Sequence, residues 1–410
     1  MKALFTRRGA GLAAACVVLF GCGPALAEEF ERPPSYAPAT ALGRAWKGDN
    51  YTVLSPITSD GFLRHYRTRT AFGEFETTGD QLMAARIREL NALQALAGTS
   101  SAQEFGAGVA KAATGPLAFA GNLIRNPVGT TQSTVNGVGQ FVGSIGSGIK
   151  NMGESRDSAV ESLTGQARQK RLLAARLGVD PYTDFMPLEA KLNELAGASA
   201  IGGLAVSGAF LVVPGAAGIA LSNVSTADTV GALATDYTSA QLMDMNRTKL
   251  ASLGVDASTA NSLFANPFYT PVDVTAMTRA AEKIGATANL GSMLARAATA
   301  NDRATAYFIR KRMELTAGQT GFTGPMVGYL GVESLRFPLV RTGAGAVVGA
   351  YPVDILSWTP DTAKIIDGLA AVASSAAANA KTLAITGTAT PLARRSLAAR
   401  GWKLRERASF

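Results

Sequence analysis

Apolar positions recur at helical spacing in the first half of the chain. Between Asp80 and Gly98, the residues Leu82, Met83, Arg86, Ile87, Leu90, Leu93 and Leu96 fall mostly three or four positions apart. This period predicts a helix that begins at Asp80, buries one face and stops at Gly98. Similar patterns continue to residue 320, and we therefore predict a helical body over residues 79–320.

Strand patterns flank this body on both sides. Residues 49–78 contain two β-rich runs around Ser59, Asp60 and Gly61, which predicts a β-hairpin. Residues 321–410 contain a hairpin pattern around 342–345, a helix from Pro360, a strand over 381–387, a short helix from Pro391 and a last strand from Trp402. The predicted fold is mainly α with β elements (α+β), with an N-terminal β-hairpin, a Gly/Ala-rich helical body and a small C-terminal α/β unit.

The tetrapeptide Leu-Gly-Val-Asp occurs twice, at residues 177–180 and 253–256, each time after a basic and apolar helical stretch. We interpret both copies as corners between helices. Glycine takes the left-handed conformation after a helix end, and aspartate caps the next helix. Pro181 would then occupy the first helical position in the first copy. A catalytic role for Asp180 or Asp256 is the alternative.

Two helical segments are unusually rich in glycine. Residues 135–152 place apolar residues on one face beside Gly139, Gly143 and Gly146, which favours close helix packing. Residues 195–227 contain no charge, and the apolar part 196–222 is long enough to cross a membrane. Its glycines, the break at Pro214 and the basic residues upstream argue against a span. We predict a buried helical hairpin, with membrane insertion as the alternative.

Residues 1–27 resemble an export signal, because Lys2, Arg7 and Arg8 precede an apolar run and small residues end at Ala27. Cleavage there would leave Glu28 first, followed by a Pro-rich, extended leader over 28–48. The sequence Leu-Phe-Gly-Cys, which ends at Cys22, is a competing site that would leave a lipidated cysteine. We therefore predict a periplasmic or secreted protein, or alternatively one that is lipid-anchored through Cys22.

The net charge of +9 is concentrated at the two ends of the chain. The signal carries +3 and residues 391–410 carry +5, so residues 28–390 are near neutral. An exported protein meets little nucleic acid, and we exclude nucleic acid as a partner. Anionic lipid or envelope glycan is the expected partner of the basic end, beside a protein partner or a second copy of the chain.

The basic end forms one candidate site. Period-two alternation in the last strand sends Trp402, Leu404 and Ala408 to one face and Lys403, Arg405 and Arg407 to the other. With Arg394 and Arg395, the second set forms a candidate anion-binding ladder. The alternative is a structural one, in which the basic side chains protect an edge strand from pairing with another sheet. The loop over 385–391 could also bind an anion through backbone N–H groups.

Most catalytic chemistries lack the residues that they need. His65 is the sole histidine, and both cysteines, Cys16 and Cys22, lie in the signal. We therefore predict no metal site, no cofactor and no catalytic triad. A Ser-x-x-Lys match at 147–150 lacks its partner motif. Carboxylates remain as acid–base candidates, in the pairs Glu74 and Glu76, Asp180 and Asp184, and Asp354 and Asp361.

These observations favour an exported cell-envelope protein with a non-enzymatic binding or structural role at a membrane surface or with an envelope partner. Two alternatives remain open. One is a periplasmic glycan hydrolase that uses carboxylates. The other is a membrane-inserting protein that uses the apolar hairpin at 196–222.

Overall fold

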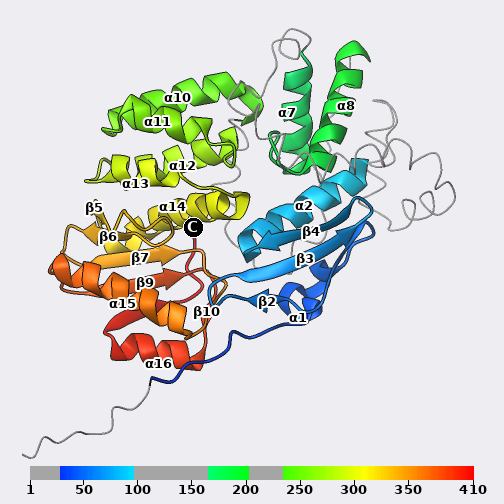
Figure 1. The fold of residues 1–410 in the computed structure, drawn as a ribbon. Coiled ribbons are helices and arrows are strands. Elements are labelled where there is room, and N and C mark those ends of the chain that lie inside the picture. Colours follow the sequence, from blue (N-terminus) through cyan, green and yellow to red (C-terminus); the bar gives the residue numbers. More distant parts are fainter. Residues whose placement is uncertain (1–27, 97–164, 203–233) are drawn as a thin grey trace, which may run out of the picture.

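The computed structural model describes residues 28–96, 165–202 and 234–410 (Figure 1). It confirms the predicted fold class, with a small antiparallel sheet near the N-terminus, a helical middle and a mixed C-terminal sheet with helices. The predicted signal with Cys22, the glycine-rich segment 135–152, and the apolar segment 196–222 beyond Gly202 lie outside the described residues.

The N-terminal sheet has four strands, β1 (Tyr51–Val53), β2 (Thr58–Ser59), β3 (Arg64–Thr70) and β4 (Gly73–Thr78). β2 and β3 pair on either side of the predicted turn at 59–61. The longer hairpin, β3–β4, was not predicted. Its second strand has the sequence GEFETT, in which Phe75 is the one large apolar residue, and so cross-strand pairing with β3 must stabilise it.

The leader is less extended than predicted. Helix α1 (Pro38–Leu42) and a 3₁₀ turn (Gly43–Trp46) follow its prolines, and Leu42 is fully buried. Proline at the first helical position explains the difference, because its fixed φ starts a helix as readily as it extends a chain. The leader thereby becomes part of the hydrophobic core beneath the N-terminal sheet.

That core also contains three helices, α2 (Asp80–Leu96), α7 (Gln166–Leu177) and α8 (Met186–Gly202). The seven periodic positions predicted for α2 are all buried, including Arg86. α7 and α8 pack as an antiparallel pair beside α2 (Figure 1). The sequence predicts one helical body, but the structure divides its helices between two hydrophobic cores. Helices α2, α7 and α8 share their core with the first sheet.

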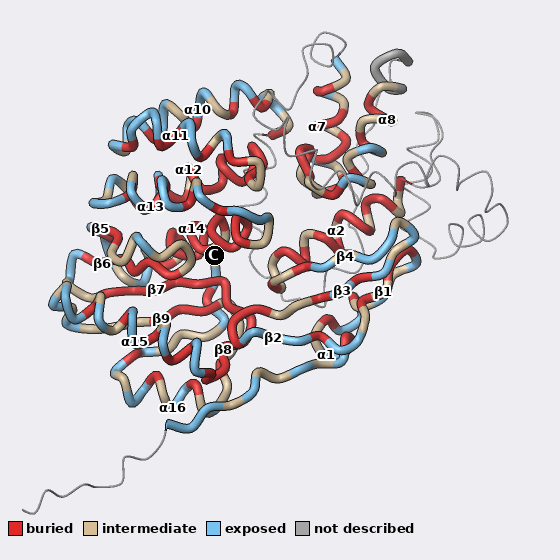
Figure 2. The backbone as a smooth tube through the Cα atoms, in the orientation of Figure 1, coloured by how far each residue is buried: buried red, intermediate tan, exposed pale blue. Residues whose placement is uncertain are grey.

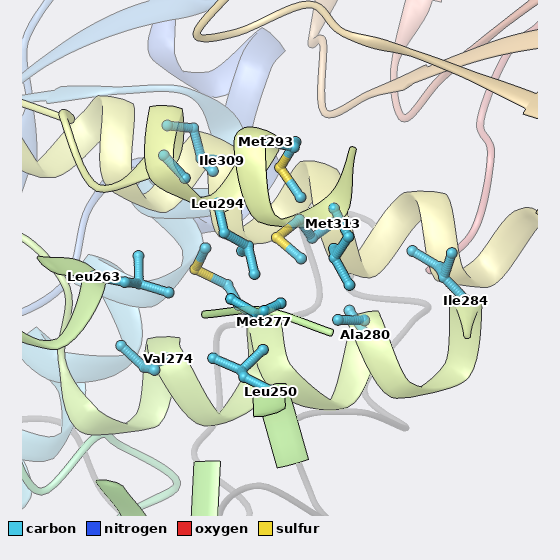
Figure 3. Packing of buried hydrophobic residues seen from close by; sticks show 14 of the residues in the cluster. Leu250, Leu263, Val274, Met277, Ala280, Ile284, Met293, Leu294, Ile309 and Met313 are labelled. Atoms are coloured by element: carbon cyan, nitrogen blue, oxygen red, sulfur yellow. The ribbon is translucent and has the colours of Figure 1, made fainter. Parts of the chain in front are cut away.

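The second core belongs to α10 (Ser239–Ser252), α11 (Ala257–Ala265), α12 (Pro271–Ile284), α13 (Leu290–Ala297) and α14 (Arg303–Thr323). Figure 3 shows Leu250, Met277, Met293 and Met313 meeting between these helices. Side chains of Thr238, Asp256, Thr270 and Asp302 cap the helix starts by accepting backbone N–H groups. Four of these five helices thus begin at a local capping signal, whereas α13 has no side-chain cap.

The two Leu-Gly-Val-Asp corners differ in their last residue. Gly178 and Gly254 both have positive φ, as predicted. Asp256 caps α11, whereas α8 begins only at Met186, so Pro181 is not at a first helical position and that prediction is wrong. The carboxyl of Asp180 instead accepts hydrogen bonds from the Tyr182 N–H and from the Thr270 hydroxyl. A long-range bond to α12 replaces the local cap.

The C-terminal sheet has the order β11–β9–β7–β6–β5. Its strands are β5 (Met326–Leu330), β6 (Leu339–Thr342), β7 (Val347–Tyr351), β9 (Lys381–Ile385) and β11 (Trp402–Arg405). Helices α15 (Pro360–Ser375) and α16 (Pro391–Ala399) connect the parallel strands, and the predicted helices, hairpin and strands of this unit are all present. α15 and α16 cover one face of the sheet and α14 packs against the other (Figure 1).

A short seam joins the first sheet to the C-terminal unit. β8 (Ile355–Leu356) pairs with β10 (Thr388–Ala389), and the N–H groups of Asp354 and Ser357 donate to carbonyls of Phe62 and Gly61. Figure 2 shows continuous burial through β7 and the chain beside β8. The seam brings Asp354 next to α2, across 274 residues of sequence.

Candidate functional site

The predicted basic residues lie around α16 and the edge strand β11. Arg394 forms an ion pair with Glu406, with Nε and Nη2 at 3.0 and 2.7 Å from the two carboxylate oxygens. Arg395, Lys403 and Arg407 are exposed. The Arg405 guanidinium donates to Oε1 of Gln319 on α14 at 2.9 Å. β11 is an edge strand, as the structural alternative requires.

These side chains do not form one ladder. Leu404 packs with the core beneath α15 and α16, whereas Arg405 points to α14 on the opposite face of the sheet. The strand ends at Arg405, and Arg407 has φ of 52°, which reverses the alternation. Ala408 therefore packs with Leu315 of α14 and not on the face of Trp402, which corrects the predicted faces.

An exposed aromatic ring lies beside these cations. Phe322, near the end of α14, is 69% exposed, more than any other large hydrophobic residue that the structure describes. The Arg405 guanidinium carbon lies 4.2 Å from the ring centre. Lys403 lies two residues earlier on β11, and so its side chain leaves the same face of the strand as Arg405. The sequence pattern gave no sign of this pairing, because Phe322 and Arg405 belong to distant elements.

The loop over 385–391 already holds carboxylates of the protein itself. Thr390 caps α16 by accepting the Ala393 N–H, and the Ala389 N–H donates to Oε1 of Glu406 at 2.6 Å. The Thr390 hydroxyl bonds to the carboxyl of Glu31. Hydrogen bonding and the Arg394 charge hold the pKa of Glu406 below its usual range. Of the backbone donors predicted to bind an external anion, Ala389 therefore binds an internal carboxylate, and those of Gly387, Thr388 and Thr390 donate to backbone carbonyls.

Two carboxyl groups meet at the seam. Oδ2 of Asp354 accepts the N–H groups of Arg64 and Asp80 at 2.9 and 3.0 Å. The carboxyl of Asp80 accepts the Arg64 guanidinium and the Tyr66 hydroxyl, each at 2.5 Å. Asp354 is 3% exposed, and burial together with the negative charge of Asp80 raises its pKa well above the usual value. A carboxyl with a raised pKa beside a second carboxyl has the electrostatics of an acid–base pair.

A longer ionic network lies between the two helical cores. Asp273 on α12 is fully buried and pairs with Arg303 and Arg310 of α14. Arg310 also pairs with Glu314 at 2.8 Å. From Arg303 the network continues to Asp184, and from there to Arg86 and Glu89 of α2. Burial alone would raise the pKa of Asp273, but the two guanidinium groups lower it below its usual range.

The other predicted carboxylates have separate surroundings. Glu74 pairs with Arg69 across the β3–β4 hairpin, and Glu76 lies opposite Arg67. Asp184 belongs to the buried network, and its pKa is lowered to about 2, because the guanidinium groups of Arg86 and Arg303 outweigh the effect of burial. Asp180 has a pKa raised to about 6 by burial and by the charge of Asp273. Asp361 is exposed in the first turn of α15 and is not beside Asp354 in the seam.

His65 lies on the outer face of β3. Its ring is within 3.5 Å of the Asp60 carboxyl and 3.2 Å of the Thr78 hydroxyl, and hydrogen bonding to Asp60 raises its pKa. Within the described ranges, no group of three or more His, Cys, Asp or Glu residues could hold a metal ion. Over the same ranges, no helix is long and apolar enough to cross a membrane. The Ser-x-x-Lys match lies outside the described residues.

Comparison with protein-family models, with curated proteins and with solved structures gives no match to this chain. The function must therefore be argued from the sites themselves. Sequence reasoning named Asp180, Asp184 and Asp354 but missed their partners Thr270, Arg303 and Asp80. No local signal could have found them, since the bonds join residues 90, 119 and 274 positions apart.

Proposed function

We propose that this protein is an exported cell-envelope protein with a non-enzymatic binding role, and that its C-terminal unit binds an anionic membrane surface. One observation carries the proposal, namely the exposed ring of Phe322 beside Arg405 on the face of β11 that also bears Lys403. Aromatic rings insert at the boundary between lipid headgroups and acyl chains, and basic side chains pair with anionic headgroups. Each basic residue near such a surface contributes about 1 kcal/mol.

The first test is sedimentation of the mature protein with vesicles. We expect binding to vesicles that contain an anionic phospholipid, weaker binding to neutral vesicles, and loss of binding in high salt as the charges are screened. Phe322→Ala and Lys403→Gln should each weaken binding several-fold. Matched controls are Tyr237→Ala, an exposed ring in another part of the chain, and Lys283→Gln, an exposed lysine on α12.

A second arm separates lipid from an acidic envelope glycan, which offers the same charge without an apolar layer. If the wild type and Phe322→Ala bind the glycan with equal affinity, the surface would be assigned to glycan. Equal binding to neutral and anionic vesicles, insensitive to salt, would contradict an electrostatic role for Lys403 and Arg405. No binding to either ligand would contradict the proposal as a whole.

Glycan hydrolysis is a second candidate function, favoured by the carboxyl pair of Asp80 and Asp354 at the seam. The raised pKa of Asp354 suits a general acid. We rank this function lower because Asp354 is 3% exposed and its Oδ2 already accepts two backbone N–H groups. Release of reducing sugar from envelope glycan by the wild type, and its loss in a folded Asp354→Asn variant, would reverse this ranking.

A further inference from the structure

Residues 28–31 run against the C-terminal unit before the chain enters the first sheet. Figure 1 shows this start of the described chain, in dark blue, passing beside α16. The N–H of Glu31 donates to the carbonyl of Trp358 at 2.9 Å, and Oε1 of Glu31 accepts the N–H of Trp358 at 2.6 Å. The Thr390 hydroxyl donates to the same oxygen. The backbone and the side chain of Glu31 are therefore both bound.

Glu28 makes a second contact three residues earlier. Its Oε1 accepts the indole N–H of Trp358 at 3.0 Å and the Arg400 guanidinium at 2.6 Å. Arg400 lies over the Trp358 ring, 4.6 Å from the ring to the guanidinium carbon, and also pairs with Asp367 at 2.8 Å. Because Trp358 is fully buried and Arg400 is held by Asp367, these donors are ordered by the C-terminal unit itself.

The two residues between these contacts take little part in them. Glu29 is exposed, and the Phe30 ring is 43% exposed. The two carboxylates accept the side-chain hydrogen bonds that hold this segment to Trp358, Thr390 and Arg400. Hydrogen bonds between a carboxylate and a charged or backbone donor are stronger than neutral ones. The attachment should therefore depend on the charges of Glu28 and Glu31 and not on that of Glu29.

We propose that the C-terminal unit carries a binding site for an acidic peptide of the form Glu-x-x-Glu, and that residues 28–31 of the same chain are its ligand. Trp358, Thr390 and Arg400 form the site. The segment joins residues 28–31, which precede the first sheet, to the C-terminal unit. This site is separate from Phe322 and Lys403, and its test does not depend on membrane binding.

The first experiment measures amide hydrogen exchange of residues 28–35 in the mature chain. The wild type should protect the Glu31 amide, which donates to Trp358. The double variant Glu28→Gln with Glu31→Gln should exchange there about tenfold faster or more, because the four hydrogen bonds to these side chains lose their ionised acceptors. Glu29→Gln, which removes the same charge from the same segment, should match the wild type. Unchanged protection in the double variant would overturn the proposal.

The second experiment supplies the ligand from outside. A labelled peptide with the sequence EEFERPP, residues 28–34, is titrated into the double variant, whose own segment is released. We expect binding, with a change in Trp358 fluorescence, and about tenfold weaker binding to the wild type, because a tethered segment competes at an effective concentration in the millimolar range. A peptide with glutamine in place of Glu28 and Glu31, and with Glu29 unchanged, should not bind. Equal binding of the two peptides, or no binding of EEFERPP, would overturn recognition of Glu-x-x-Glu.

Discussion

The C-terminal strand and the helical body use charge in opposite ways. Lys403 and Arg407 are exposed beside an edge strand, where water solvates them. Asp273 is fully buried between α12 and α14, and two guanidinium groups neutralise it. The exposed charges of the strand are available to a ligand and contribute little to the stability of the fold. The buried charges of the helical body are tolerated only while each has its oppositely charged partners, so removing one partner destabilises the fold.

A sum of charges along the sequence reveals only the exposed basic residues of the C-terminal strand. Residues 391–410 carry +5, while the near-neutral chain before them conceals the ionic network of Arg86, Asp184, Arg303 and Asp273. Opposite charges cancel in a sum over sequence, although in space they form a chain of largely buried ion pairs. Variants in the two regions should therefore differ widely in their effect on stability.

The largest effect is expected for Asp273→Asn. The substitution leaves Arg303 and Arg310 without their shared carboxylate in a buried place, although Asp184 and Glu314 still pair with them. We expect the free energy of unfolding to fall by about 3 kcal/mol, as measured by urea denaturation. Asp244→Asn, which removes an exposed partner of Arg247, is the control and should cost less than about 0.5 kcal/mol. Equal losses in the two variants would contradict the contrast between the regions.

A smaller, pH-dependent effect is expected at Asp180. Its pKa is raised to about 6 in the folded protein, against about 3.9 in an unfolded chain. The folded state therefore binds the proton more tightly, and the stability that this provides is present below pH 4 and is lost as the pH rises through 6. Relative to Asp180→Asn, the wild type should lose about 1–2 kcal/mol between pH 4 and pH 6.5, as followed by urea denaturation at each pH.

Asp184 sharpens this prediction. It lies four residues after Asp180, but its pKa is lowered to about 2. The stability that it provides is therefore complete above about pH 5 and is lost as the pH falls toward 1. The difference in the free energy of unfolding between wild type and Asp184→Asn should change by less than about 0.5 kcal/mol between pH 4 and pH 6.5. Two results would contradict the assigned surroundings of these carboxyl groups. One is a free-energy difference for Asp184→Asn that changes strongly with pH in that window, and the other is a difference for Asp180→Asn that does not change.

The sequence predicted the elements of the fold well where the signal is local. The period of Leu82 to Leu96 gave α2, and Gly254 with Asp256 gave the corner before α11. The prediction failed at Pro181, because Asp180 binds the Tyr182 N–H and the distant Thr270 hydroxyl, and the next helix begins only at Met186. It also missed β4, whose sequence favours a strand only when β3 lies beside it.

The candidate sites were less predictable, since distant residues complete each of them. The basic residues of 391–410 were visible in the sequence, but Phe322 was not, because α14 brings it to Arg405 from 83 positions away. Asp354 was a named candidate without its partner Asp80. Glu31 lies 359 positions from Thr390, and nothing in the leader suggested that its acidic residues bind there. A sequence shows which residues could form a site, but only the fold shows which of them lie next to one another.

The smallest effects are expected on β11 and the residues just after it, and here the comparison can be tested within residues 403–407. Lys403 and Arg407 are exposed, so the double variant Lys403→Gln with Arg407→Gln should change the free energy of unfolding by less than about 0.5 kcal/mol. Arg405→Gln should cost more, about 1 kcal/mol, because it loses both the bond to Gln319 and the packing on Phe322. Urea denaturation of the three proteins measures both values. If Arg405→Gln proved as neutral as the double variant, the whole strand would be a solvated edge. A loss above about 2 kcal/mol in the double variant would instead mean that Lys403 or Arg407 is bound by the fold, and the contrast between the exposed strand and the buried network would then fail.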